Sequence, residues 1–126
     1  MPVRTYAEPM RALILLLSLA SPAIADPLFG RWGTTAQCAG LPLIAGGTRL
    51  AAPFEIGPDW LRHGAVWCRL QWFDTQPRQG GQFRAARAQC GEDSVQGYSL
   101  GFSLQGDELT ILWNEALANG PLRRCD

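Results

Sequence analysis

The stretch that decides the fold reads YSLGFSL at residues 98–104 and ELTILW at residues 108–113, with the turn QGD between them at residues 105–107. In both segments large apolar side chains recur at every second position. A period of two is typical of a β-strand with one buried face. Because the turn between the segments is short and contains a glycine, the whole stretch predicts a β-hairpin.

Residues 65–73 form another apolar segment, upstream of the hairpin. Alternation along a strand gives this segment two faces. We expect the face that carries Cys68 to point into the core, where a disulfide is shielded from solvent. Trp67, Arg69 and Phe73 share the opposite face.

The other strand candidates are short and are separated by turn signals. Residues 82–90 predict a strand, with a helix as the less favoured alternative because alanine and arginine are good helix formers. Together, the candidate segments make about seven short strands at roughly ten-residue spacing. This spacing predicts an all-β fold, either a small antiparallel barrel in up-and-down order or a sandwich. The remaining candidate strands are residues 29–33, 50–56 and 60–63, and the candidate loops are residues 37–47 and 75–82.

The amino-terminal residues have the pattern of a cleaved leader. Two arginines precede an apolar run at residues 12–17, and the small-residue pattern AIA follows at residues 23–25. The run is shorter than the roughly 20 apolar residues that a helix needs to cross a bilayer. We therefore predict a signal peptide at residues 1–25 and one exported β domain, periplasmic or secreted, at residues 26–126. A leader that stays on as a membrane anchor is the alternative.

The net charge of the chain limits the classes of partner that it is expected to bind. The full chain carries 11 basic and 11 acidic residues, and the leader takes two basic residues and one acidic residue, so the mature part is close to neutral. Nucleic-acid binding calls for a clustered basic surface, and binding to a membrane surface calls for a basic amphipathic segment. Neither pattern is present, so we expect no nucleic-acid partner and no binding to a membrane surface. No second apolar stretch follows the leader, so we also expect no membrane span in the mature form.

The four cysteines, Cys38, Cys68, Cys90 and Cys125, all lie after the predicted leader. An even count in a short exported chain indicates a disulfide framework. Their spacing does not resemble a zinc knuckle or a redox motif. Of the three possible pairings we favour Cys68–Cys90, which would join neighbouring strands, and Cys38–Cys125, which would tie the front of the domain to its last residues. We therefore expect two disulfides to brace the β fold.

Few residues of the mature part could carry catalysis. His63 is the single histidine, and beside Gly64 in a turn it is expected to be solvated rather than a catalytic base. The chain has no G-x-S-x-G motif and no glycine-rich phosphate loop that leads into a helix. The acidic pairs at residues 92–93 and 107–108 are expected to be solvated turn charges, with a calcium site as the alternative. We expect no enzymatic activity, no metal and no cofactor.

Five tryptophans are a surplus for a domain of this size. Trp72 and Trp113 lie on apolar strand faces, and we expect them in the core. An exposed row of aromatic and arginine side chains is typical of a protein-binding surface. We therefore predict that Trp67, Arg69 and Phe73 bind a partner. The alternative is that the candidate loop at residues 37–47, or a second sheet, covers this face.

The segment FGRW at residues 29–32, the early Cys38 and the closing pair Arg124-Cys125 resemble a loose class of small exported bacterial proteins with four cysteines. The members of that class have no assigned activity. The opening is also similar to that of periplasmic barrel inhibitors of metalloproteases, and this likeness implies a barrel. The chain departs from those inhibitors by its second pair of cysteines. Because the likeness is confined to so few residues, no functional residue carries over.

These observations favour a small exported binding protein, in particular an inhibitor of a hydrolase, whose partner is another envelope or secreted protein. The loop at residues 75–82 is the predicted blocking element. Two alternatives stay open. One is a barrel that carries a small apolar ligand in a cavity lined by aromatic residues, and the other is a structural or assembly factor of the envelope.

Overall fold

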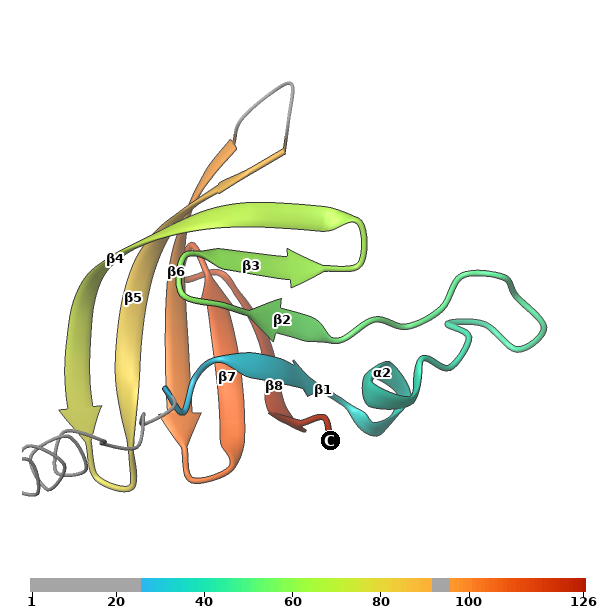
Figure 1. Cartoon of the computed structure of the whole chain (residues 1–126), viewed down its shortest axis with the longest axis horizontal. Helices are drawn as coiled ribbons and strands as arrows, with labels where there is room; N and C mark the ends of the chain where they lie inside the picture. The colour runs from blue at the N-terminus through green and yellow to red at the C-terminus, as the bar shows by residue number, and fades with distance from the viewer. Residues whose placement is uncertain (1–25, 92–95) are drawn as a thin grey trace, which may run out of the picture.

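The computed structural model describes residues 26–91 and 96–126, and the predicted leader and the acidic pair at residues 92–93 lie outside these residues. The described chain forms a closed barrel of antiparallel strands in which each strand pairs with its neighbours in the sequence and the last pairs with the first (Figure 1). The all-β, antiparallel, up-and-down fold class is thereby confirmed as a barrel. It has eight strands instead of about seven.

Most of the strands lie where the sequence predicts them, and one short helix is added. The strand missing from the sequence analysis is the last one, whose sequence LANGPLRR contains a glycine and a proline, both of which are depleted in strands. Gly120 is required there because a Cβ atom would stand 2.8 Å from the Leu109 carbonyl oxygen of the neighbouring strand. The elements are β1 (Gly30–Gly33), α2 (Thr35–Ala39), β2 (Phe54–Ile56), β3 (Trp60–His63), β4 (Val66–Arg78), β5 (Gly81–Cys90), β6 (Gln96–Gln105), β7 (Glu108–Trp113) and β8 (Leu117–Arg124).

The β-hairpin predicted at residues 98–113 is formed by β6 and β7, which are joined by a turn in which Gly106 has a φ of 58°. Every second residue of these strands points into the barrel, as the alternation predicted. The core continues through the inward positions of the other strands. Its fully buried large side chains include Trp32, Phe54, Leu61, Phe102 and Ile111.

Two expectations about local structure are wrong. Residues 75–82 are not a loop, because β4 runs to Arg78 and β5 begins at Gly81, leaving a two-residue turn in which Gly80 has a φ of 78°. A bulge between Trp72 and Asp74 bends β4 and lets the strand continue beyond the apolar segment. Residues 50–56 contain only the short β2. Residues 82–90 do form the expected strand and not a helix.

The helix α2 lies at the start of the expected loop at residues 37–47. Thr34 caps it, because its hydroxyl accepts from the Gln37 N–H while the Gln37 side chain accepts from the Thr34 N–H. Gly40 ends the helix in the left-handed conformation. The T-x-x-Q capping box followed by a glycine was therefore a readable signal for this helix.

Two disulfides brace the barrel, Cys38–Cys125 and Cys68–Cys90, and both are the favoured pairs. Cys68 and Cys90 are register partners on β4 and β5. Cys38 lies on α2, just after β1, and Cys125 lies just after β8, so their bond lies beside the β1–β8 pair that closes the barrel. Disulfides of this kind are typical of an oxidising compartment. Within residues 26–91 and 96–126, no helix is long and apolar enough to cross a membrane.

Candidate functional site

The predicted binding residues Trp67, Arg69 and Phe73 all point outward from β4 and are exposed. Among the residues that the structure describes, neither a loop nor a second sheet buries this face. Trp67 and Phe73 are nevertheless far apart, because six residues of extended strand span about 20 Å and β4 bends between them (Figure 1). The structure therefore keeps the three residues on one strand face without gathering them into one cluster.

Trp67 ends a row of outward side chains that crosses four strands in register. Arg31, Glu55, Arg62 and Trp67 lie side by side on β1, β2, β3 and β4. Glu55 accepts a hydrogen bond from Arg62 Nε at 2.7 Å and lies 3.6 Å from Arg31 Nε. Exposed ion pairs of this kind contribute little stability. Their effect on the surface is that one carboxylate stands between two guanidinium groups, so the face beside Trp67 is net positive.

Phe73 belongs to a different part of the surface. It is the extra residue of the β4 bulge. Together with Arg87 it lines two shallow pockets of about 280 and 250 Å³, the first of which also reaches Tyr98 and Asn114. Phe73 therefore lies next to side chains of β5 and β6, whereas Trp67 lies next to side chains of β3.

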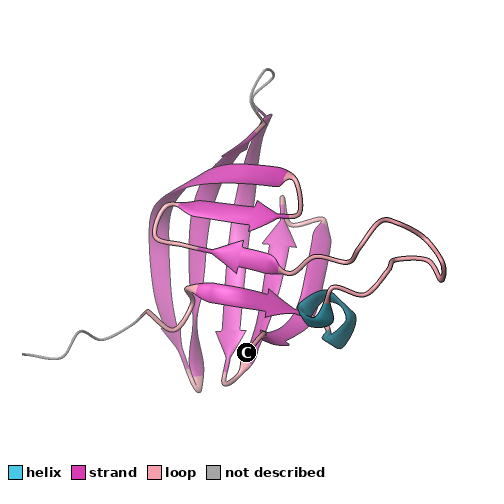
Figure 2. Cartoon of the chain, turned by 45° about the vertical axis from the view of Figure 1, so that its right-hand side comes forward, coloured by secondary structure: helices cyan, strands magenta, loops and turns pink. Residues whose placement is uncertain are grey.

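Residues 41–50 form the most apolar exposed feature of the described chain, here called the apolar arm. All ten residues are exposed, and Figure 2 shows the arm projecting away from the barrel wall. Contiguous exposed apolar side chains mark interaction sites. Its large side chains are Leu41, Leu43, Ile44 and Leu50, with exposed fractions of 49, 62, 76 and 60%.

Backbone hydrogen bonds give the apolar arm a defined shape. The Leu43 N–H donates to the Arg49 carbonyl at 2.9 Å, and Pro42 and Leu50 form an antiparallel bridge. The tip is closed by the Gly47 N–H, which donates to the Ile44 carbonyl at 2.8 Å. The arm is thus a narrow, hairpin-like element of two chain segments.

The apolar arm and Trp67 lie at the same end of the barrel. The chain leaves the arm and enters β2 at Phe54, whose register partner is His63 at the end of β3. His63 in turn pairs with Val66, the residue before Trp67. Val66 and Trp67 are both exposed, so this end of the barrel carries further exposed apolar side chains besides those of the arm.

His63 packs instead of reaching freely into solvent. Its ring stacks on Phe54 with 4.0 Å between the ring centroids and an angle of 17° between the planes. Among residues 26–91 and 96–126 no group of three or more histidine, cysteine or acidic side chains is placed to hold a metal ion. The histidine is therefore best explained as a packing residue that closes the end of β3.

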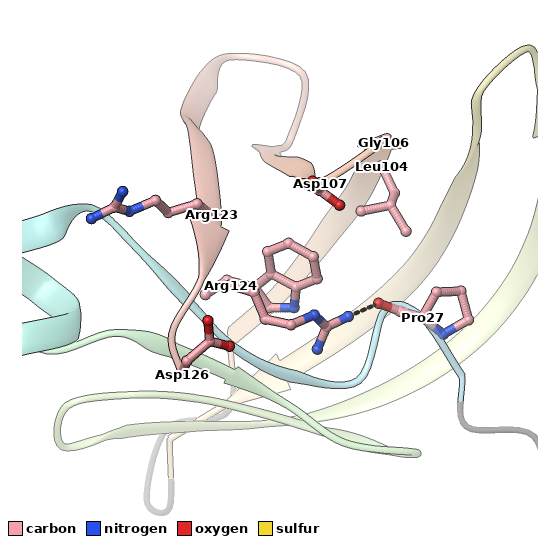
Figure 3. Close-up of a pocket in the computed structure, with 8 residues that line it drawn as sticks. Pro27, Leu104, Gly106, Asp107, Arg123, Arg124 and Asp126 are labelled. Atoms are coloured by element: carbon pink, nitrogen blue, oxygen red, sulfur yellow. Dashed lines mark hydrogen bonds between the residues drawn. The ribbon is translucent and has the colours of Figure 1, made fainter.

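A second site lies at the barrel mouth, the end formed by the β4–β5 and β6–β7 turns, where residues 26–29 cross the opening. Arg124 lies over the Trp32 ring at 4.4 Å and donates hydrogen bonds to the carbonyls of Pro27 and Phe29. It lines a pocket of about 530 Å³ (Figure 3). A second pocket of about 430 Å³, on the other side of Pro27, reaches the β4–β5 turn.

Arg84 also faces this mouth, from inside the barrel, and the sequence analysis did not single it out. The signal for it was the alternation of β5, which places Arg84 on the same face as Ala86 and Ala88. Small side chains on a core face leave room for a larger neighbour. Here that room is filled by the guanidinium group over the Trp72 ring at 4.2 Å.

Comparisons with known proteins found no relative. No family model matches the chain, and neither the curated proteins nor the solved structures contain a significant match. The apolar arm and the barrel mouth are therefore the features from which a function can be inferred.

Proposed function

We propose that this chain is an exported protein, periplasmic or secreted, that binds another envelope or secreted protein by inserting the apolar arm into a cleft of that partner. The observation that carries the proposal is the exposure of four large aliphatic side chains on one ordered, projecting element. Burying each of them would contribute about 1.5–3 kcal/mol. A binding role, and not a catalytic one, is part of the proposal.

The attachment of the arm supports this role. The arm follows the capped helix α2, which the Cys38–Cys125 disulfide ties to the end of the barrel. At its other end the Ala51 N–H donates to the Leu41 carbonyl at 2.7 Å, which closes the base of the arm. A loop held in its bound shape loses less entropy on binding than a free loop does.

The shape of the arm favours a concave partner, and hydrolases present such clefts. We therefore propose a secreted hydrolase as the partner class, with the apolar arm as the blocking element. The earlier candidate, residues 75–82, consists of strand ends and a two-residue turn between β4 and β5, and it does not project from the barrel as the arm does. We propose that Trp67 and Arg69 contact the rim of the same cleft, since β4 begins at the end of the barrel from which the arm projects.

Aspartate at the tip of the arm should abolish inhibition. In a panel of lysozymes and secreted proteases, we expect the Leu43→Asp/Ile44→Asp variant to weaken inhibition of the target by about 30-fold or more, because two buried apolar contacts are replaced by desolvated charges. The matched control is Leu117→Asp, which places a charge at an exposed leucine of β8. Equal losses in both variants, or no inhibition of any hydrolase by the wild-type protein, would contradict the proposal.

Alanine at Trp67 should weaken binding of the same partner by about tenfold, because an aromatic side chain at an interface contributes on this scale. The control is Phe73→Ala, since Phe73 lies on a separate part of the surface. Inhibition constants and thermal unfolding are measured for both variants. A Trp67→Ala variant with unchanged binding and unchanged stability would remove Trp67 from the site.

A further inference from the structure

Arg84 is the charged residue on the inward face of β5, and its side chain is only 13% exposed. Its guanidinium group lies 4.2 Å from the centre of the Trp72 ring and 5.6 Å from that of Phe29. A guanidinium group between aromatic faces is held in a fixed orientation. Arg84 is therefore a preorganised cation at the mouth of the barrel.

Asp26, the partner of Arg84, does not accept from all the N–H donors of the guanidinium group. Asp26 Oδ2 lies 2.8 Å from Arg84 Nη1, while Asp26 Oδ1 accepts from the Leu28 N–H at 2.9 Å. The carboxylate is thus divided between two donors. Arg84 Nε is buried and has no hydrogen-bond partner within the described residues. A carboxylate that is not bound to the backbone in this way could accept from two guanidinium N–H groups at once.

The Asp26 side chain can leave Arg84 without opening the core. The chain after Asp26 is held by its backbone, because Arg124 donates to the carbonyls of Pro27 and Phe29, and by the buried Leu28 side chain. Rotation of the Asp26 side chain into solvent therefore breaks its pair with Arg84 and its hydrogen bond from the Leu28 N–H, and it leaves the barrel closed.

The space beside Arg84 is suited to an apolar chain. The pocket of about 430 Å³ has a largely apolar lining that includes Pro27, Pro77 and Leu104. Arg84 is not itself on this lining, but its register partner Thr75 is, and so is Gln82 on the same face of β5. None of its lining residues is acidic. The pocket on the other side of Pro27 is lined by two carboxylates and two guanidinium groups, those of Asp107, Asp126, Arg123 and Arg124 (Figure 3), so an anion there would meet charges of both signs.

We propose that the barrel mouth binds an amphipathic monocarboxylate, with its carboxylate on Arg84 and its apolar chain in the 430 Å³ pocket, and that Asp26 occupies the carboxylate position when no ligand is bound. Asp26 then competes with the ligand for the same guanidinium group. This site is separate from the apolar arm and does not depend on the proposed protein partner.

The test is calorimetric titration of sodium decanoate into the wild-type protein and into the Asp26→Asn variant. Asparagine keeps the oxygen that accepts from the Leu28 N–H, but it removes the competing charge. We expect the variant to bind decanoate about tenfold more tightly, because one charge-assisted hydrogen bond to Arg84 becomes free for the ligand. The uncharged probe 1-decanol should bind both proteins alike and more weakly than decanoate binds the variant.

Arg84→Gln in the Asp26→Asn background should remove the preference for decanoate over decanol while leaving decanol binding intact, which also shows that the pocket has formed. If that variant does not fold, the comparison of the two probes on the Asp26→Asn protein decides alone. Equal decanoate affinity with and without Asp26, equal affinity for the two probes, or no binding of decanoate would each overturn the proposal. None of these results affects the apolar arm.

Discussion

Removing the Cys38–Cys125 disulfide is expected to lower the free energy of unfolding by about 4–5 kcal/mol. The bond closes a loop of 87 residues, so its loss frees a large part of the unfolded chain. It also releases the closing pair of strands, β1 and β8, which share only two register pairs, Trp32 with Arg124 and Gly33 with Arg123. Urea unfolding of the Cys38→Ala/Cys125→Ala variant measures the loss.

The second disulfide provides the comparison. Cys68 and Cys90 are separated by 22 residues, and a loop of that length predicts a loss of about 3 kcal/mol in the Cys68→Ala/Cys90→Ala variant. The strands that it joins, β4 and β5, are paired along ten register positions without it. A smaller loss for the Cys38–Cys125 bond than for the Cys68–Cys90 bond would contradict a role in fastening the barrel closure.

Alanine at Phe102 is expected to cost about 3–5 kcal/mol of the free energy of unfolding, because a large buried ring is replaced by a cavity. Phe102 is fully buried on β6, and its ring lies 5.3 Å from that of Trp72. Since a domain of this kind has only about 5–15 kcal/mol of stability in total, the variant should unfold at a much lower urea concentration than the wild-type protein.

Phe73→Ala is the matched control for Phe102→Ala, because it deletes the same ring at an exposed position. Its unfolding free energy should change by no more than about 0.5 kcal/mol. If the two alanine variants lost similar stability, either the inward position of Phe102 or the exposure of Phe73 would be wrong.

Local alternation was enough to predict most strands. Each strand of the β6–β7 hairpin carries its own period-two pattern, and the turn between them contains Gly106. The last strand was missed because local propensity counts Gly120 and Pro121 against a strand, while the close approach of Gly120 to the neighbouring strand is a tertiary feature. The extension of β4 past residue 73 was missed for a similar reason, since a bulge resets the alternation there.

The sites were harder to predict than the strands. The outward direction of Trp67 followed from the position of Cys68 on the opposite face. The exposure of the apolar arm could not be predicted, because leucine and isoleucine in a loop are usually covered, and only the whole fold shows what lies over them. The pair of Asp26 and Arg84 joins residues 58 positions apart, and no local pattern links them.

The order of the disulfides along the chain has a consequence for how this protein is made. The two bonds are nested, because the first cysteine, Cys38, pairs with the fourth, Cys125, and the second, Cys68, pairs with the third. A chain that enters an oxidising compartment from its amino end presents Cys38 and Cys68 together, long before the partner of Cys38 arrives. An oxidase that joins cysteines as they appear would therefore make a bond that the barrel does not contain. If the protein is exported in this way, as proposed above, the native pairs form only when oxidation waits until the strands have paired, or when thiol–disulfide exchange replaces the first bond.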